Sequence, residues 1–190
     1  AQAATNVHGK DATYNQAFRA LKKTAADKAA TEEKSFELII PYLKRFKEIN
    51  PRSVCEFQID NEDNMTQLFV CPGIMNACLD YTRPVMSLDA AHLKSRWRGT
   101  LYIGSLKTPL DHIFPVAFSI TKDNEDYKGW KYFLTLLNRA CPKLKDAHPL
   151  RRVTFHKYTF ISDPDKGLKQ ALQEVFPRNH VTPCAIHFQS

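Results

Sequence analysis

The sequence lacks three features that would set it apart from ordinary globular proteins. No apolar run approaches the roughly 20 residues of a membrane-spanning helix. No internal repeat or low-complexity tract interrupts the chain. The five cysteines are odd in number and scattered, which favours a reducing compartment over a disulfide framework. With 190 residues, 43% of them hydrophobic, the chain suits one domain, or a compact core with an appendage.

Positive charge exceeds negative charge in this sequence. Lys and Arg number 27 against 20 Asp and Glu, which gives a net charge of +7. A basic protein of this kind is expected to bind a polyanion such as nucleic acid. Charge by itself does not distinguish such binding from an ordinary solvated basic surface.

Hydrophobic periodicity predicts two helices and a β-hairpin followed by the order β-β-β-α-β-α-β. The predicted elements are helices in 11–30 and 31–50, a hairpin of 53–60 and 66–74, strands in 84–92, 99–108 and 112–121, a helix in 127–142, a strand in 153–163, a helix in 168–176 and a strand in 180–188. We therefore expect an α/β (α+β) fold with a mixed sheet. The expected division lies between an N-terminal region, 1–83, and a core, 84–190.

The stretch FISDPDKGL, residues 160–168, leaves two interpretations open for Asp163. It has the features of a helix N-cap, with Pro164 at the first helical position and Asp165 in the first turn. It is also an acidic residue at a strand end, where it would help to hold a metal ion. One carboxylate is too few for Mg²⁺, which takes several hard oxygen ligands in octahedral geometry.

Asp89 is the expected second carboxylate. It interrupts the apolar run VMSLDAAH in the first core strand, where a buried charge is costly unless it is paired or metal-bound. In a β-β-β-α-β-α-β sheet the first strand commonly lies beside the fourth. We therefore expect Asp89 and Asp163 to meet on neighbouring strands.

Four segments in this order resemble the Mutator-like element (MULE) transposases, whose catalytic domain has the RNase H-like fold. They are SLDAAHLKSRWRGTLYIGS, FPVAFSITKDNEDYKGWKYFLTLL, FISDPDKGLKQALQEVFP and the closing CAIH. The resemblance covers roughly residues 10–190 and implies an RNase H-like mixed sheet. It also implies metal-dependent DNA strand cleavage and transfer.

The resemblance implies that Asp89 and Asp163 bind two Mg²⁺ or Mn²⁺ ions together with a later Glu. It also implies a Cys-x-x-His, which Cys184 and His187 fit. Two departures stand out. The usual Asp-Gly-Thr-His reads Asp-Ala-Ala-His from Asp89 to His92, and no Glu follows His187 before Ser190. We therefore expect this chain by itself to hold metal weakly and to cut DNA poorly.

Three further candidates for metal chemistry each have a structural alternative. Glu125 corresponds to an acidic residue ahead of a Trp in the resembling transposases, but the same segment supplies helix caps at Asn124 or Asp126. Cys184 and His187 have the spacing of half a zinc site. Further Zn²⁺ ligands could come from His180, from His92 or from a C-terminal region; the alternative is a buried structural Cys and a hydrogen-bonded His.

Basic residues flank both predicted acidic positions and are candidates for phosphate contact, the alternative being a solvated face. The candidates are Lys94, Arg96, Arg98, Lys143, Lys145, Arg151, Arg152 and Lys157. Trp97 either stacks on a base or packs against the neighbouring strand.

Two functions remain open. The first is a DDE-type transposase core that acts on DNA. The second is a domesticated transposase remnant, without enzymatic activity, that binds DNA or a protein partner as a transcriptional regulator or a secreted effector. A homodimer and a host or regulatory protein partner are further expectations. The first function predicts the nucleus; because the chain begins AQAAT without Met, a removed signal peptide would instead predict secretion.

Overall fold

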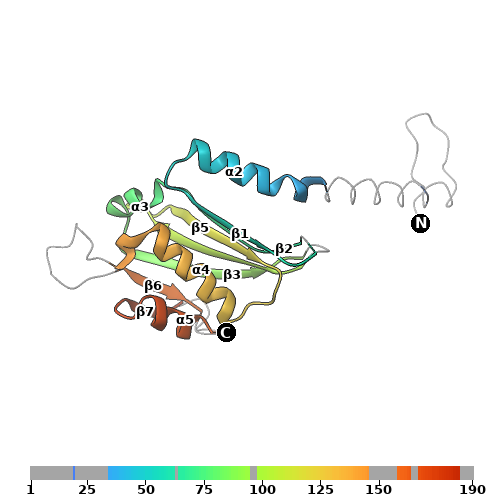
Figure 1. The fold of residues 1–190 in the computed structure, drawn as a ribbon. Helices are drawn as coiled ribbons and strands as arrows, with labels where there is room; N and C mark the ends of the chain where they lie inside the picture. The colour runs from blue at the N-terminus through green and yellow to red at the C-terminus, as the bar shows by residue number, and fades with distance from the viewer. Residues whose placement is uncertain are drawn as a thin grey trace, which may run out of the picture. The chain divides into compact units, whose positions relative to one another are not determined.

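The computed structural model describes residues 19, 34–62, 64–94, 98–145, 158–163 and 167–184 (Figure 1). The chain divides into two compact units, residues 1–45 and 46–190. The helix predicted over 11–30 lies outside the described residues except for Arg19, which is helical.

The second predicted helix is present in two pieces. Residues 34–37 are helical, Leu38 forms a turn, and helix α2 follows over Ile39–Ile49. Pro41 lies in the first turn of α2, where its missing N–H removes no intrahelical hydrogen bond. None of the helices in the described ranges is both long and apolar enough to cross a bilayer.

Seven strands form one mixed sheet in the order β1-β2-β5-β4-β3-β6-β7. Strands β1 to β5 pair antiparallel, whereas β6 runs parallel to β3 and β7 runs parallel to β6. Their bounds are β1 Val54–Ile59, β2 Met65–Cys71, β3 Val85–His92, β4 Thr100–Lys107, β5 Ile113–Thr121, β6 Thr159–Ser162 and β7 His180–Pro183. The α/β class and the predicted strand and helix order from β3 onward are confirmed; the assignment to the RNase H-like fold stays a prediction.

The N-terminal hairpin is part of this sheet. Strand β2 pairs with β5, so β1 and β2 extend the meander of β3, β4 and β5 at its β5 edge. The connection from the hairpin to β3 contains the short helix α3, Met75–Cys78, and a 3₁₀ turn, Leu79–Tyr81, which the sequence patterns did not predict. The predicted division at residue 83 therefore falls inside the second compact unit, and it stays a prediction.

Helix α4, Tyr127–Ala140, packs its apolar side on the sheet. Asp126 caps it, because Oδ1 accepts a hydrogen bond from the Gly129 N–H at 2.8 Å. Trp130 meets Tyr102 of β4 edge-to-face at 4.7 Å between ring centroids. A side chain at Gly129 would bring its Cβ within 2.2 Å of the Tyr102 hydroxyl, so glycine is required for this close approach.

Helix α5, Leu168–Val175, packs beside α4 over the same face of the sheet (Figure 1). Phe160 of β6 contacts Phe176, just after α5, at 4.9 Å between ring centroids, and both are buried. Tyr127 donates a hydrogen bond to Glu174 at 2.7 Å and so joins the two helices at the surface.

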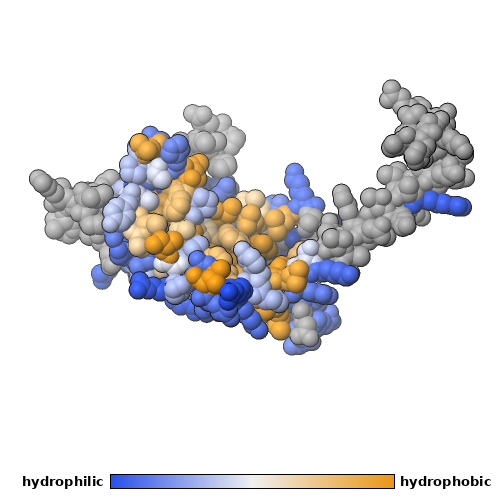
Figure 2. Space-filling view, turned by 90° about the horizontal axis from the view of Figure 1, so that it is seen from above, coloured by the Kyte–Doolittle hydropathy of each residue, from blue (hydrophilic) through white to orange (hydrophobic). Residues whose placement is uncertain are grey.

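The two faces of the sheet differ in burial. On the face under α4 and α5, Met86, Leu88 and Tyr102 are all at most 3% exposed. On the other face Phe118 is 39% exposed, and Ile103 and Ile161 are half-buried. Figure 2 shows hydrophobic residues gathered over the middle of one view of the molecule, with hydrophilic residues around them. Asp89 lies on the less covered face, one residue beyond Leu88.

Candidate metal and nucleic-acid site

The pairing of β3 with β6 places Asp89 and Asp163 side by side. The last paired residues of these parallel strands are Leu88 and Ser162, and the two acidic residues follow them directly. Neighbouring strands lie about 4.8 Å apart, so the two residues fall within reach of one ion. The expectation that the strands of Asp89 and Asp163 are neighbours is confirmed. We call the edge at which β3, β6 and β7 end the carboxyl end of the sheet.

The predicted burial of Asp89 is wrong. Side chains alternate along β3, so that Met86 and Leu88 face the core whereas Ser87 and Asp89 are exposed on the other face. Asp89 Oδ1 accepts a hydrogen bond from the Ala90 N–H at 2.8 Å. Asp89 therefore carries no burial cost that a metal ion has to offset.

The helix-cap interpretation of Asp163 is also wrong. Helix α5 begins only at Leu168, and its N-cap is Gly167, which has φ = 84° and no side-chain cap. Within the described part of the chain, no hydrogen bond or ion pair engages the half-buried carboxylate of Asp163. Pro164 and Asp165, the other parts of the predicted cap, lie outside the described residues.

Cys184 lies in the same row as the two acidic residues. Ser162 pairs with Pro183 across β6 and β7, and the Cys184 N–H donates to the Ser162 carbonyl at 2.9 Å. Cys184 is therefore the neighbour of Asp163 on the next strand, and it is half-buried. Sequence spacing alone did not predict this three-strand row, because it depends on the register of both parallel pairs.

The two histidines proposed as zinc partners of Cys184 lie too far from it. His180 begins β7, four residues before Cys184, or about 13 Å along an extended strand. His92 ends β3, three residues beyond Asp89 and two strands away from β7. Zinc ligands lie about 2.0–2.3 Å from the ion, so neither histidine can share one ion with Cys184. His187 lies outside the described residues, which contain no group of three or more His, Cys, Asp or Glu able to hold a metal.

Glu125 has a structural contact. Its carboxylate accepts a hydrogen bond from the Trp130 indole N–H at 3.1 Å, on the loop that leads into α4. The predicted cap of α4 is confirmed for Asp126. This hydrogen bond helps to stabilise the start of α4. The catalytic role of Glu125 stays a prediction.

The predicted basic cluster is divided by the fold. Lys143 and Lys145 lie on the 3₁₀ turn Pro142–Lys145, which contacts Asn179, just before β7 begins, and so lies at the opposite end of the strands from Asp163. Lys143 forms an ion pair with Asp80, and Lys145 Nζ lies 5.7 Å from the Phe176 ring centroid. Their placement beside the acidic residues is wrong. The candidates outside the described residues are Arg96, Arg151, Arg152 and Lys157, together with Trp97.

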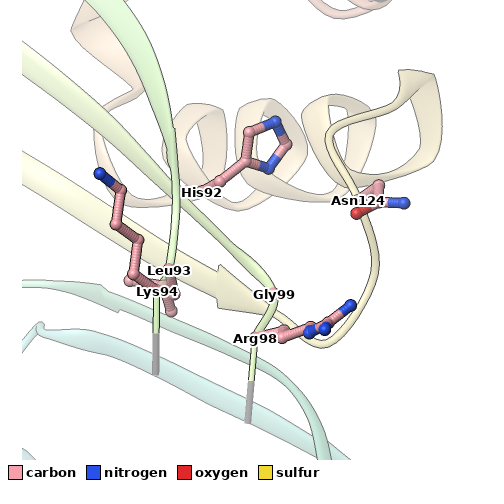
Figure 3. Close-up of a pocket in the computed structure, with 6 residues that line it drawn as sticks. All are labelled: His92, Leu93, Lys94, Arg98, Gly99 and Asn124. Atoms are coloured by element: carbon pink, nitrogen blue, oxygen red, sulfur yellow. The ribbon is translucent and has the colours of Figure 1, made fainter. Parts of the chain in front are cut away.

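Lys94 and Arg98 remain at the carboxyl end of the sheet, where β3 turns into β4. Both are exposed and line a pocket together with His92, Leu93, Gly99 and Asn124 (Figure 3). Asn124 comes from the β5–α4 loop, and neither its place here nor that of His92 followed from the sequence patterns. The basic run KSRWR, which ends just before Gly99, was the one signal available for this turn.

The comparisons with known proteins agree with this arrangement. Residues 85–190, more than half of the chain, match the family model of the MULE transposase domain. The match begins at the first residue of β3 and includes Asp89, Asp163 and Cys184. No curated protein matches the chain. The matched region contains the complete strand row at the carboxyl end of the sheet, and the chain belongs to the MULE transposase family.

Proposed function

We propose that this chain supplies the metal-binding part of a site that cleaves and transfers DNA strands by phosphoryl transfer. The observation that carries the proposal is the parallel β3–β6 register, in which Leu88 pairs with Ser162 and Asp89 adjoins Asp163. The proposed ion is Mg²⁺ or Mn²⁺, and the proposed substrate is the phosphodiester backbone of DNA. A nuclear location follows from a DNA substrate.

The donor set fits a hard divalent ion. Asp89 and Asp163 offer carboxylate oxygens, the ligand type that Mg²⁺ and Mn²⁺ prefer. No cation among the described residues pairs with either carboxylate, whereas Asp80 and Asp111 are both ion-paired. The thiol of Cys184 is a soft ligand, and it suits Zn²⁺ better than Mg²⁺.

The residues of this chain would hold and orient the reacting groups. Asp89 is fixed by strand pairing on both sides of β3 and by its own contact with the Ala90 N–H, so its carboxylate has a defined position. Asp163 lies beside it at the end of β6. Bound divalent ions supply Lewis-acid activation of the attacking oxygen and stabilisation of the leaving oxygen. Lys94 and Arg98 would contact phosphates next to this site.

To test this proposal, Mn²⁺ is titrated into wild type, Asp163→Asn and Asp80→Asn. Electron paramagnetic resonance measures the fraction of Mn²⁺ that is bound. Asparagine removes the charge of Asp163, so we expect Mn²⁺ affinity to fall at least about tenfold. Asp80→Asn is the matched control, because it removes a carboxylate from the opposite end of the strands. Equal binding curves for all three proteins would refute the metal site.

A second candidate is a domesticated transposase that binds DNA or a protein without catalysis. It is favoured by the observation that the described residues bring together two carboxylates and one thiol but no three-ligand metal cluster. This function predicts DNA binding that is unchanged by chelation of divalent ions. The transposase function predicts that Mn²⁺ tightens binding to DNA and that Asp163→Asn removes this effect.

A further inference from the structure

The pocket at the β3–β4 turn has the composition of an anion site. It has a volume of about 200 Å³, and its wall includes His92, Lys94, Arg98 and Asn124 (Figure 3). In Figure 3 the side chains of His92, Arg98 and Asn124 surround one space, whereas Lys94 projects from the other side of its strand. These are an imidazole, a guanidinium and an amide, which all donate hydrogen bonds.

The backbone on one side of the pocket is held in an unusual conformation. Arg98 has φ = 49° and Gly99 has φ = 105°, both in the left-handed region. A side chain at Gly99 would place its Cβ 2.3 Å from the Thr121 carbonyl oxygen, and the Leu93 N–H donates to the Gly99 carbonyl at 2.9 Å. Gly99, which leads into β4, is thus held closely against Leu93 and against Thr121 of β5. A left-handed conformation is unfavourable for Arg and is tolerated by Gly and Asn, so local backbone preference does not explain Arg98.

Among the residues that the structure describes, no acidic side chain is ion-paired with the cations of this pocket, Lys94 and Arg98. The two acidic side chains that follow Asn124 make other contacts: Asp126 caps α4, and Glu125 accepts a hydrogen bond from the Trp130 indole N–H. The Asp123 side chain, which precedes Asn124, is exposed. The Arg98 guanidinium, the cation that points into this space, disfavours a metal ion as the ligand and favours an anion with several acceptor oxygens.

We propose that this pocket binds one phosphate group of a DNA backbone, with Arg98 and His92 as the donors that contact it. His92 lies three residues beyond Asp89 on β3, about 10 Å along the strand, and because side chains alternate it belongs to the opposite face of the sheet. The assignment to DNA rests on the proposed function. The shared chemistry is a phosphate oxyanion, which inorganic phosphate also presents.

The structure offers a matched pair of variants for testing the pocket. Arg98→Asn removes the guanidinium and keeps a residue that tolerates the left-handed backbone. Arg52→Asn makes the same change at another exposed arginine with positive φ, 70°, ahead of β1 and at the opposite end of that strand from the pocket. Both variants lose one positive charge, so a nonspecific effect of net charge appears equally in both.

The first measurement is a titration with inorganic phosphate, followed through the NMR signals of the His92 ring and through binding calorimetry. We expect the His92 signals to shift in wild type and in Arg52→Asn, and the phosphate affinity of Arg98→Asn to fall about tenfold. Unfolding curves check that both variants keep wild-type stability. Equal phosphate affinities in the two variants, or unshifted His92 signals, would refute the proposal that this pocket binds phosphate.

The second measurement is the anisotropy of a labelled DNA duplex at several salt concentrations. For Arg98→Asn we expect weaker binding and a salt slope smaller by about one, compared with wild type and Arg52→Asn. A variant that loses phosphate binding but keeps full DNA binding overturns the assignment to DNA and leaves a site for a free anion. Failure of the metal site is recognised separately, because Asp163→Asn then leaves Mn²⁺ binding unchanged while Arg98→Asn still weakens DNA binding.

Discussion

The two ends of the parallel strands contain the same kinds of polar side chain, but these side chains differ in how many of their polar groups have a partner within the described part of the protein. At the end where β3, β6 and β7 begin, Asp80 pairs with Lys143, and the Tyr158 hydroxyl donates to the Leu79 carbonyl. There the Asn179 amide donates to two backbone carbonyls. At the carboxyl end, Asp163, Lys94 and Arg98 have no ion-pair partner among the described residues. A polar group that is already paired supports the fold, whereas an accessible, unpaired group is available to bind a ligand.

The same contrast holds for the thiols. Cys71 and Cys141 are at most 1% exposed, and their sulfur atoms lie 3.8 Å apart. The hydrogen bond with Cys141 and burial both raise the pKa of Cys71, so its thiolate is scarce at neutral pH. Cys184 is half-buried beside Asp163. The first pair belongs to the core, and the third thiol borders the candidate site.

The largest predicted effect that tests this contrast is therefore in thiol reactivity. With a small alkylating reagent at pH 8, we expect Cys184 to react at least about a hundredfold faster than Cys71 or Cys141, because the latter two need the core to open. Mass spectrometry of the labelled peptides gives each rate. In denaturant the three rates should converge, and comparable rates in the native protein would contradict the contrast.

The next effect is on stability at the end where the strands begin. Burial raises the pKa of Tyr158 to about 12, and Tyr158 is 2% exposed. An unfolded tyrosine ionises near 10, so the stabilisation is complete below about pH 10 and is lost as pH rises through about 12. The two-unit difference corresponds to about 2.7 kcal/mol.

This pH dependence separates Tyr158 from an exposed tyrosine. We expect Tyr158→Phe to lower the free energy of unfolding by about 1–3 kcal/mol at pH 7, because it removes the short hydrogen bond of a buried hydroxyl and leaves the Leu79 carbonyl with only the longer bonds from Thr82. Between pH 10 and 12 the variant should lose about 2–3 kcal/mol less than wild type. Tyr81→Phe, at a position 76% exposed, should behave as wild type. If Tyr158→Phe and wild type lose the same stability between pH 10 and 12, the pH dependence does not come from Tyr158.

The smallest effects are expected from two lysines that are chemically alike. Lys143→Gln breaks the partly exposed pair with Asp80 and should cost about 0.2–1 kcal/mol of stability, with no loss of DNA affinity. Lys94→Gln should leave stability unchanged and weaken DNA binding, with a smaller salt slope. Chemical denaturation and anisotropy measured on both variants give the comparison. A larger loss of DNA affinity in Lys143→Gln than in Lys94→Gln would reverse it.

Much of the fold followed from local sequence pattern. The alternation in β4 and the Trp130, Phe133 and Leu137 stripe of α4 depend on residues close together in the chain, so they were predictable. Helix α3 and the following 3₁₀ turn were missed because they are short and lack a clear apolar period. The cap at Asp163 was predicted wrongly because the local sequence favoured it, yet α5 begins five residues later at Leu168.

The candidate site was predictable in part. Neighbouring strands for Asp89 and Asp163 followed from the predicted β-β-β-α-β-α-β order, in which the first strand commonly lies beside the fourth, and the pairing of β3 with β6 confirms them. The exposure of Asp89 did not follow, because the apolar run VMSLDAAH contains both a core-facing and an outward-facing set of side chains. Lys143 and Lys145 were misplaced because nearness to Asp163 in sequence carries no information about which end of the strands they occupy.

The sequence by itself determined which residues form strands and helices and which family the chain resembles, because periodicity and short motifs are local properties. Only the tertiary structure decided which charges share an edge, because this depends on the register of β3, β6 and β7 and on where each loop returns. A shift of one residue in the β3–β6 pairing would put Asp89 and Asp163 on opposite faces of the sheet, and the same shift between β6 and β7 would remove Cys184 from the row.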